Sequence, residues 1–270
     1  TTAHTLSLHD ALPISNNESS KVAIVTGGSR GVGAATAKLL ASKGWNVTIT
    51  CTSSMEDANE VVKECEQFGV ESLAIKADVS ENKDCVETVE KTLEKWGRID
   101  SLVNNAGTTK FVFNHADLDG LDADDFLHIY KVNVVGPFQM VKACKDTLMK
   151  SENPSVVNIS SIAGIKGIGS SLAYASSKGA LNTMTKSMAR NLGPIRVNAI
   201  CPGFIQGEWL RKGMGDELYN AAKDNLTSST PLKLTVTPEQ VALGIYNFIE
   251  ISTVVTGETM LMDGGHHLII

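Results

Sequence analysis

The segment from Ala23 to Gly33, which reads AIVTGGSRGVG, constrains the fold of this chain more than any other. An apolar run, a glycine-rich turn and the helix-forming AATAKLLASKG predict a strand that reverses tightly into a helix. The first N–H groups of such a helix face outward as an anion site, and glycines let a phosphate approach the backbone. The spacing Gly27-x-x-x-Gly31-x-Gly33 differs from the G-x-G-x-x-G dinucleotide fingerprint, so by itself it also fits a structural turn.

A second motif, YASSK, places Tyr174 and Lys178 four residues apart, with Ser161 upstream in NISSIAG. Residues four apart share one face of a helix, so the ammonium is expected beside the phenol. A phenol has a pKa of about 10, and moving it toward 7 requires roughly 4 kcal/mol of phenolate stabilisation, which a neighbouring cation supplies. The motif predicts an acid catalyst and the group that tunes it, although Y-x-x-x-K alone is also common on helix surfaces.

Together these motifs resemble the short-chain dehydrogenase/reductase family, and the chain is similar to its 3-oxoacyl-acyl-carrier-protein reductase-like members. The resemblance extends from about Lys21 to Gly265. It is carried, in order, by T-G-x-x-x-G-x-G at Thr26 to Gly33, N-N-A-G at Asn104 to Gly107, Asn133 in KVNVVG, Ser161, Tyr174, Lys178, NAICPG at Asn198 to Gly203, and TGETMLMDGG at Thr256 to Gly265.

The pattern of apolar runs predicts an α/β fold. The chain has 270 residues and 42% hydrophobic content, which suits one substantial core and a single domain over residues 21–270. Short apolar runs alternate with amphipathic helical stretches, which predicts a Rossmann-like, doubly wound, mostly parallel seven-stranded sheet with helices on both faces. The seven runs are VAIVT, NVTIT, SLAIK, SLVNN, SVVNIS, RVNAI and ETMLMD.

Residues 1–20 stand apart from this pattern. The stretch TTAHTLSLHDALPIS has neither a basic start nor a long apolar core, so it does not read as a signal peptide. TLSLHDALPIS resembles a translated sequencing adapter, which would make the segment a non-native leader; the alternative is a disordered native tail.

Composition excludes several classes of protein. The net charge is −6 and no dense Lys/Arg block occurs, so nucleic acid is not an expected partner. No apolar run approaches a membrane span, so we expect no membrane partner. The five cysteines include no C-x-x-C pair, and the histidines show no ligand spacing. We therefore expect reduced thiols, a cytoplasmic protein and no metal.

The resemblance implies a nicotinamide dinucleotide cofactor. NAD enzymes typically place Asp or Glu at the end of the second strand, whereas this chain has Cys51-Thr52-Ser53-Ser54, with Arg30 available to balance a 2′-phosphate. We predict NADP(H), with NAD(H) as the alternative. The implied cofactor-binding residues are Thr26, Gly27, Ser29, Arg30, Gly31, Val32, Gly33, Thr52, Ser53, Asp78, Val79, Asn105, Ala106, Gly107, Tyr174, Lys178, Pro202, Gly203 and Ile205.

The resemblance also implies hydride transfer between nicotinamide and a carbonyl carbon without a metal. Tyr174 would act as general acid/base and Ser161 would hydrogen-bond the substrate oxygen. Lys178 would hold the nicotinamide ribose and lower the pKa of Tyr174, and Asn133 would position a water for proton relay. Two alternatives stay open: Asn133 could only satisfy backbone groups in a helix, and Ser160 rather than Ser161 could face the pocket.

Substrate and assembly are less constrained. Ile165, Lys166 and a mobile lid from Phe204 to Thr230, which contains Trp209, Leu210 and Met214, are expected to select a small ketone or secondary alcohol. A 3-oxoacyl-acyl-carrier-protein reductase is the alternative. A catalytically impaired dinucleotide-binding sensor or scaffold is the alternative from another class. The resemblance implies a homotetramer or homodimer, paired through helices near Asp124–Leu148 and Tyr174–Leu192.

Overall fold

The computed structural model describes residues 20–269, so all of the predicted leader except Ser20 lies outside the described residues. Seven strands form one sheet in the order β3-β2-β1-β4-β5-β6-β7. All six neighbouring pairs are parallel, which confirms the predicted fold class. The strands are β1 (Val22–Val25), β2 (Asn46–Cys51), β3 (Ser72–Lys76), β4 (Ser101–Asn104), β5 (Ser155–Ile159), β6 (Arg196–Pro202) and β7 (Thr259–Met262).

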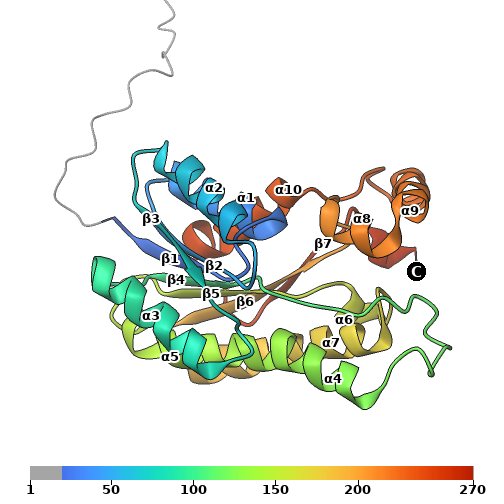
Figure 1. Ribbon diagram of the computed structural model, residues 1–270, viewed down its shortest axis with the longest axis horizontal. Helices are drawn as coiled ribbons and strands as arrows, with labels where there is room; N and C mark the ends of the chain where they lie inside the picture. The colour runs from blue at the N-terminus through green and yellow to red at the C-terminus, as the bar shows by residue number, and fades with distance from the viewer. Residues whose placement is uncertain (1–19, 270) are drawn as a thin grey trace, which may run out of the picture.

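Helices cover both faces of the sheet (Figure 1). On one face lie α1 (Gly31–Ser42), α2 (Met55–Glu66) and α10 (Pro238–Tyr246); on the other lie α3 (Asn82–Trp96), α5 (Gly136–Leu148) and α7 (Leu172–Asn191). Each layer buries its own apolar cluster against the sheet. This explains why β1, β2, β4, β5 and β6 are buried at every position, as parallel strands covered on both sides must be.

The remaining helices differ from the sequence expectation in two places. The helix expected near Asp124–Leu148 is interrupted, because the π turn η1 (Lys131–Val135) separates α4 (Ala123–Tyr130) from α5. The segment expected as a lid is helical, forming α8 (Glu208–Met214) and α9 (Asp216–Ser229). The other short helices are α6 (Ala163–Lys166), η2 (Asn247–Ile251) and η3 (His266–Leu268).

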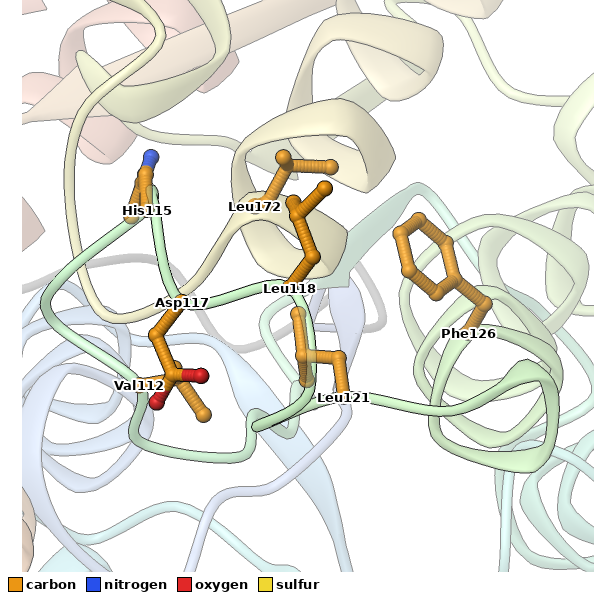
Figure 2. A pocket seen from close by; sticks show the side chains of 7 residues that line it. All are labelled: Val112, His115, Asp117, Leu118, Leu121, Phe126 and Leu172. Atoms are coloured by element: carbon orange, nitrogen blue, oxygen red, sulfur yellow. The ribbon is translucent and has the colours of Figure 1, made fainter.

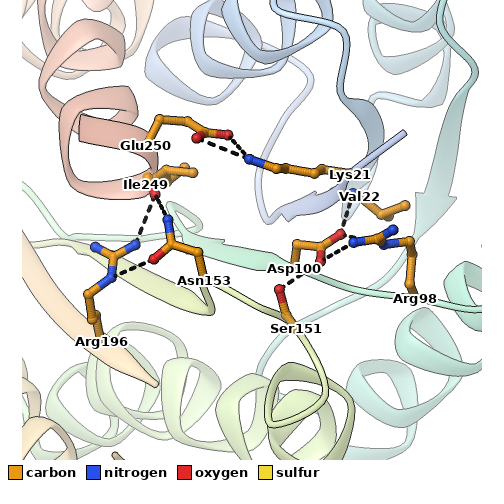
Figure 3. Close-up of polar contacts among 9 residues, drawn as sticks. All are labelled: Lys21, Val22, Arg98, Asp100, Ser151, Asn153, Arg196, Ile249 and Glu250. Atoms are coloured by element: carbon orange, nitrogen blue, oxygen red, sulfur yellow. Dashed lines mark hydrogen bonds and ion pairs between the residues drawn. The ribbon is translucent and has the colours of Figure 1, made fainter. Parts of the chain in front are cut away.

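A buried carboxylate ties together the amino ends of the central strands (Figure 3). Asp100 accepts hydrogen bonds from the main-chain N–H of Val22 at 2.9 Å, from Arg98 Nη2 at 2.8 Å and from Ser151 Oγ at 2.7 Å. Burial alone would raise the pKa of this carboxyl, but the hydrogen bonds from Arg98, Ser151 and Val22 lower it on balance. The contact joins β1, β4 and the turn before β5.

Arg196 performs a similar task at the start of β6 (Figure 3). Its guanidinium donates to the main-chain oxygens of Phe248 and Ile249, and to Asn153 Oδ1 at 3.2 Å. These contacts tie the amino end of β6 to η2 and to the segment before β5. At the opposite end of the sheet, the carboxyl ends of the strands lead into the loops that carry the site.

Among residues 20–269, no helix has the length and apolar character needed to cross a membrane.

Candidate active site

The predicted site residues gather at the carboxyl ends of the strands. The glycine turn follows β1, the segment from Asn105 to Gly107 follows β4, Ser161 follows β5, and Gly203 follows β6. The chain reverses its strand order between β1 and β4, and ligands of open α/β sheets bind at such a switch point. Parallel pairing therefore brings together segments that lie far apart in sequence.

The glycine turn has the backbone that its sequence predicts. Gly27 has φ +64° and Gly31 has φ +54°, both in the left-handed region that favours glycine. A Cβ atom on Gly33 would lie 2.3 Å from the main-chain oxygen of Gly27, so no side chain fits there. No side chain caps the amino terminus of α1, and its first turn carries no acidic residue. These features fit a bound pyrophosphate.

Two predicted cofactor residues use their polar atoms to hold this edge together. Thr26 Oγ1 accepts hydrogen bonds from the main-chain N–H groups of Asn105 and Ala106, both at 3.0 Å. In return, Asn105 Nδ2 donates to the main-chain oxygens of Thr26 and Gly27, both at 2.9 Å. The two side chains thus fix the turn after β1 against the segment after β4.

The candidate 2′-phosphate region lies at the end of β2. Thr52, Ser53 and Arg30 are exposed there, whereas Ser29 is buried within the turn. Burial raises the pKa of the adjacent Cys51 thiol, the charges of Lys76 and Arg30 act in the opposite direction, and Asp57 adds to the rise. Both cations are therefore close enough to influence the end of this strand electrostatically.

Asp78 and Val79 form the turn after β3. Asp78 Oδ1 accepts from the Ser80 N–H at 2.8 Å, while the main-chain oxygen of Val79 accepts from Gln139 Nε2 at 2.8 Å. This turn lies against the start of α5, because a Cβ on Gly136 would meet Val79 Cγ2 at 2.7 Å.

Tyr174 and Lys178 lie on successive turns at the start of α7. The helix is capped by Ser171, whose Oγ accepts from the Tyr174 N–H at 3.2 Å. Lys178 is only 4% exposed; its Nζ lies 5.5 Å from the centroid of the Tyr174 ring and donates to the main-chain oxygen of Ile159 at 2.7 Å. A Cβ on Gly107 would lie 3.6 Å from this Nζ, which places the N-N-A-G segment beside the ammonium.

Ser161, rather than Ser160, lies beside the phenol. Ser161 hydrogen-bonds the Tyr174 side chain and also accepts from the Ala163 N–H at 3.1 Å. Ser160 is buried and donates to the main-chain oxygen of Lys178 at 3.1 Å. The structure therefore brings Ser161, Tyr174 and Lys178 together and gives Ser160 a packing role.

The predicted lowering of the phenol pKa is not what the structure shows. Burial raises the pKa of Tyr174 to about 12, and the hydrogen bond from Ser161 only partly opposes this rise. Burial also lowers the pKa of Lys178 from 10.5 to about 8. Desolvation is the largest cause of both shifts, because burial disfavours the charged form of each group.

Asn133 is fully buried in the π turn η1. Its Oδ1 accepts from the Thr108 N–H at 2.8 Å, and its Nδ2 donates to the Thr108 main-chain oxygen at 2.9 Å and to Ser177 Oγ at 3.0 Å. The side chain therefore satisfies backbone groups, as the alternative held, but in the loop after β4 rather than in its own helix. Such π turns often occur at functional sites.

The predicted residues Pro202, Gly203 and Ile205 lie at the end of β6 and in the segment that leads into α8. The main-chain oxygen of Pro202 accepts from the Ile162 N–H at 3.0 Å, and a Cβ on Gly203 would lie 2.7 Å from Asp263 Cβ. Ile205 forms an isolated parallel bridge with Val236. These contacts direct the following helix over the site.

Four rings form a continuous row, here called the aromatic strip, that begins at Tyr174. Ring centroids are 6.5 Å apart for Tyr174 and Trp209, 5.6 Å for Trp209 and Phe111, and 5.5 Å for Phe111 and Phe113. Sequence reasoning named Trp209 but missed the two phenylalanines. The signal that was available is the alternation Phe111-Val112-Phe113 soon after N-N-A-G.

A separate cavity of about 220 Å³ lies between the loop of residues 105–122, α4 and the first turn of α7 (Figure 2). Val112 points toward it, while Phe111 and Phe113 belong to the aromatic strip. None of the predicted catalytic residues lines this cavity. Its lining consists of Val112, His115, Asp117, Leu118, Leu121, Phe126 and Leu172.

The doubly wound sheet, the glycine turn and the adjacent Ser, Tyr and Lys define an oxidoreductase of the dinucleotide-binding class. Residues 21–217 match the family model for short chain dehydrogenase. The chain therefore belongs to the short-chain dehydrogenase/reductase family, whose members bind a nicotinamide dinucleotide. Among the described residues, no group of three or more His, Cys, Asp or Glu is placed to hold a metal ion.

Relatives match the chain over nearly its full length. A protein of Streptomyces violaceoruber named as ketoacyl reductase 2 of the granaticin polyketide synthase is 37% identical, covering 92% of this chain and 96% of the relative. A 3-oxoacyl-[acyl-carrier-protein] reductase of Thermotoga maritima is 36% identical, covering 91% and 97%. A solved structure described as a short-chain dehydrogenase/reductase of Burkholderia xenovorans is 37% identical with a TM-score of 0.85, covering 93% and 100%.

Proposed function

We propose that this protein interconverts a ketone and a secondary alcohol by hydride exchange with a nicotinamide dinucleotide, with NADP(H) preferred. The observation that carries the proposal is the cluster in which the Tyr174 phenol bonds to Ser161 and lies against Lys178. A phenol with a pKa of about 12 stays protonated at neutral pH, so Tyr174 holds the proton that reduction requires.

In this proposal the side chains divide the work. Ser161 donates a hydrogen bond to the substrate oxygen and orients it, and Tyr174 gives its proton to that oxygen as negative charge develops. Lys178, fixed to β5, stabilises the phenolate that results. When bound, the nicotinamide supplies the hydride in reduction or accepts it in oxidation. Asn133 keeps the Thr108 backbone in place beside the reacting groups.

The preference for NADP(H) rests on charge at the end of β2. Thr52 and Ser53 are exposed hydroxyl donors, and Arg30 and Lys76 influence this region as cations. Asp57 in the first turn of α2 opposes them. Two cations against one nearby carboxylate favour a 2′-phosphate over a free hydroxyl.

A 3-oxoacyl-acyl-carrier-protein reductase is the second candidate, supported by the names of two relatives. A carrier protein is acidic and requires free cations near the site. Lys110 is paired with Asp125 at 2.6 Å and Arg211 with Asp216 at 2.9 Å, which favours a small-molecule substrate. Lys166 and Lys212 are exposed and form no ion pair with another residue in the range 20–269, so they would be the contacts of a carrier.

We also propose a homodimer or homotetramer in the cytoplasm. The apolar side chains of Leu127, Val135 and Phe138 are exposed along α4, η1 and α5, the helices expected at the subunit interface.

The test follows NADPH and NADH oxidation by absorbance with small ketones and with acetoacetyl-CoA, using the wild type and Tyr174→Phe. We expect turnover with ketones and its loss in the variant, while cofactor affinity is kept. Tyr130→Phe, which alters a tyrosine outside the site, should behave as the wild type. Full activity of Tyr174→Phe would refute the mechanism, and cofactor binding without turnover on any carbonyl would support the sensor class instead.

A further inference from the structure

The aromatic strip indicates which class of carbonyl compound the site selects. We propose that the substrate carries its carbonyl group on a flat apolar ring system, as an aryl or fused-ring ketone, and that Trp209 is the specificity-determining residue. This inference rests on the proposed function and names the substrate class for the same site.

The strip starts at the proton donor and leads outward. Tyr174 belongs to α7, Trp209 to α8, and Phe111 and Phe113 to the loop between β4 and α4. Successive ring centroids are 5.5 to 6.5 Å apart, within the range of direct aromatic contact. Because Tyr174 would protonate the substrate oxygen, the rings that follow are placed to meet the part of the substrate next to the carbonyl.

The outer rings are left partly uncovered. Trp209, beside Tyr174, and Phe113, at the far end of the strip, are each 45% exposed although both are large apolar side chains. Exposed apolar surface of this kind, continuous with a reaction centre, is typical of a binding face. Ring faces offer stacking and no hydrogen bonds, so they suit a flat apolar group better than an amide-rich acyl arm.

The charged groups beside the strip have partners of their own. Lys110 is held by Asp125 at 2.6 Å and Arg211 by Asp216 at 2.9 Å, and the Arg211 guanidinium lies 4.5 Å from the centroid of the Tyr219 ring. These cations therefore need no anionic substrate to balance them.

The loop that carries Phe111 and Phe113 is held on both sides. Phe111 packs so closely on α8 that a Cβ on Gly213 would lie 2.0 Å from Phe111 Cζ. Val112, on the opposite side of the loop, donates its N–H to the main-chain oxygen of Ser170 at 2.7 Å and lines the cavity of about 220 Å³ (Figure 2). The loop is thus held on both sides, by α8 at Phe111 and by the main chain of Ser170 at Val112, which keeps the rings of the strip in place.

The test compares 2-acetonaphthone with 2-butanone, two methyl ketones that differ in whether a flat ring system is attached. Trp209→Leu keeps an apolar side chain but removes the ring, whereas Trp209→Phe keeps a ring. We expect Trp209→Leu to lower kcat/KM for 2-acetonaphthone about 10-fold and for 2-butanone less than about 2-fold, with Trp209→Phe close to the wild type. Leu218→Ala, an exposed α9 residue outside the strip, is the matched control.

An equal loss for both ketones in Trp209→Leu, or a wild type that prefers 2-butanone, would overturn the inference while leaving the proposed function intact. Absence of turnover with both ketones and both cofactors would instead count against the proposed function. A binding measurement separates these cases: 2-acetonaphthone should quench the Trp209 emission of Tyr174→Phe, and it should leave the emission of Trp45 and Trp96 that remains after Trp209→Phe is added unchanged. Quenching that survives in the double variant would overturn the assignment of Trp209.

Discussion

The side-chain ammonium of Lys178 donates a 2.7 Å hydrogen bond to the main-chain oxygen of Ile159, the last residue of β5. This contact fixes α7 to the sheet one helical turn after Tyr174, the proposed proton donor. It also holds the ammonium in a buried position. This burial lowers the pKa of Lys178 to about 8. The bond thus fixes the geometry of the site, and the burial of the ammonium sets the response of Lys178 to pH.

We predict that reductive kcat/KM falls above pH 8. Lys178 has its pKa lowered to about 8, so it loses its charge as pH rises through that value, whereas Tyr174, with a pKa of about 12, stays protonated. The pH profile should show an alkaline limb near 8. Lys178→Arg should move that limb upward because a guanidinium does not titrate in this range. An unchanged limb in this variant would assign the titration to another group.

The same shift affects stability. The pKa of Lys178 in the folded chain lies below its ordinary value of 10.5, so the unfolded chain binds more protons between pH 8 and 10.5. The free energy of unfolding should therefore gain a stabilising contribution from Lys178 as pH rises through this window. Urea unfolding at pH 7 and pH 9.5 measures this change in the free energy of unfolding. The increase between the two pH values should be smaller in Lys178→Met than in the wild type.

Asn133→Ala should destabilise the fold by about 1 to 2 kcal/mol, because it leaves the partly buried main-chain N–H and oxygen of Thr108 without their side-chain partner. Urea denaturation measures the change. Asn191→Ala, at the exposed end of α7, is the control and should change stability by less than about 0.5 kcal/mol. Equal effects of the two substitutions would show that Asn133 does not support the loop.

Gly33→Ala should weaken dinucleotide binding at least about 10-fold, since its Cβ would lie 2.3 Å from the Gly27 oxygen and distort the turn. Isothermal titration with NADPH measures the affinity, and circular dichroism checks that the variant is folded. Ser42→Ala, at the far end of the same helix, should bind as the wild type. Unchanged affinity in the glycine variant would place the dinucleotide elsewhere.

Arg30→Ala should raise KM for NADPH about 10-fold and leave KM for NADH nearly unchanged, as a lost charge-assisted contact to a 2′-phosphate requires. Steady-state kinetics with one saturating ketone and both cofactors tests this. Lys43→Ala, at the other end of α1, is the charge-matched control. Parallel changes for both cofactors would contradict a discriminating role for Arg30.

Asp100→Asn should cost about 2 kcal/mol at pH 7, because the carboxylate accepts hydrogen bonds from Arg98, Ser151 and Val22. The folded-state pKa of Asp100 is lowered, so its stabilisation is present above the unfolded pKa of about 4 and is lost as pH falls through the folded value. Urea unfolding at pH 7 and pH 3 should show a smaller difference in the free energy of unfolding between wild type and variant at pH 3. Asp146→Asn, which changes an exposed residue of α5, should have the stability of the wild type at both pH values.

Local sequence patterns were enough to predict the sheet. Each of the seven apolar runs forms a strand, and all pairs are parallel, because strands covered on both faces must be apolar throughout. The left-handed Gly27 and Gly31 were equally readable, since only glycine adopts that backbone at no cost. The spacing of Tyr174 and Lys178 predicted a shared helix face, and their contact confirms it.

Tertiary structure decided the features that depend on distant partners. The π turn at Asn133 interrupts a pattern that reads as one helix, and the side chain of Asn133 bonds to Thr108 in the loop after β4. The pKa of Tyr174 rises because burial, which spacing cannot report, outweighs its neighbours. The contact of Phe111 with Trp209 joins a loop after β4 to a helix after β6. Backbone conformation and periodicity depend on neighbouring residues, so the sequence alone predicts them. Desolvation and ring contacts arise only when separate segments pack together.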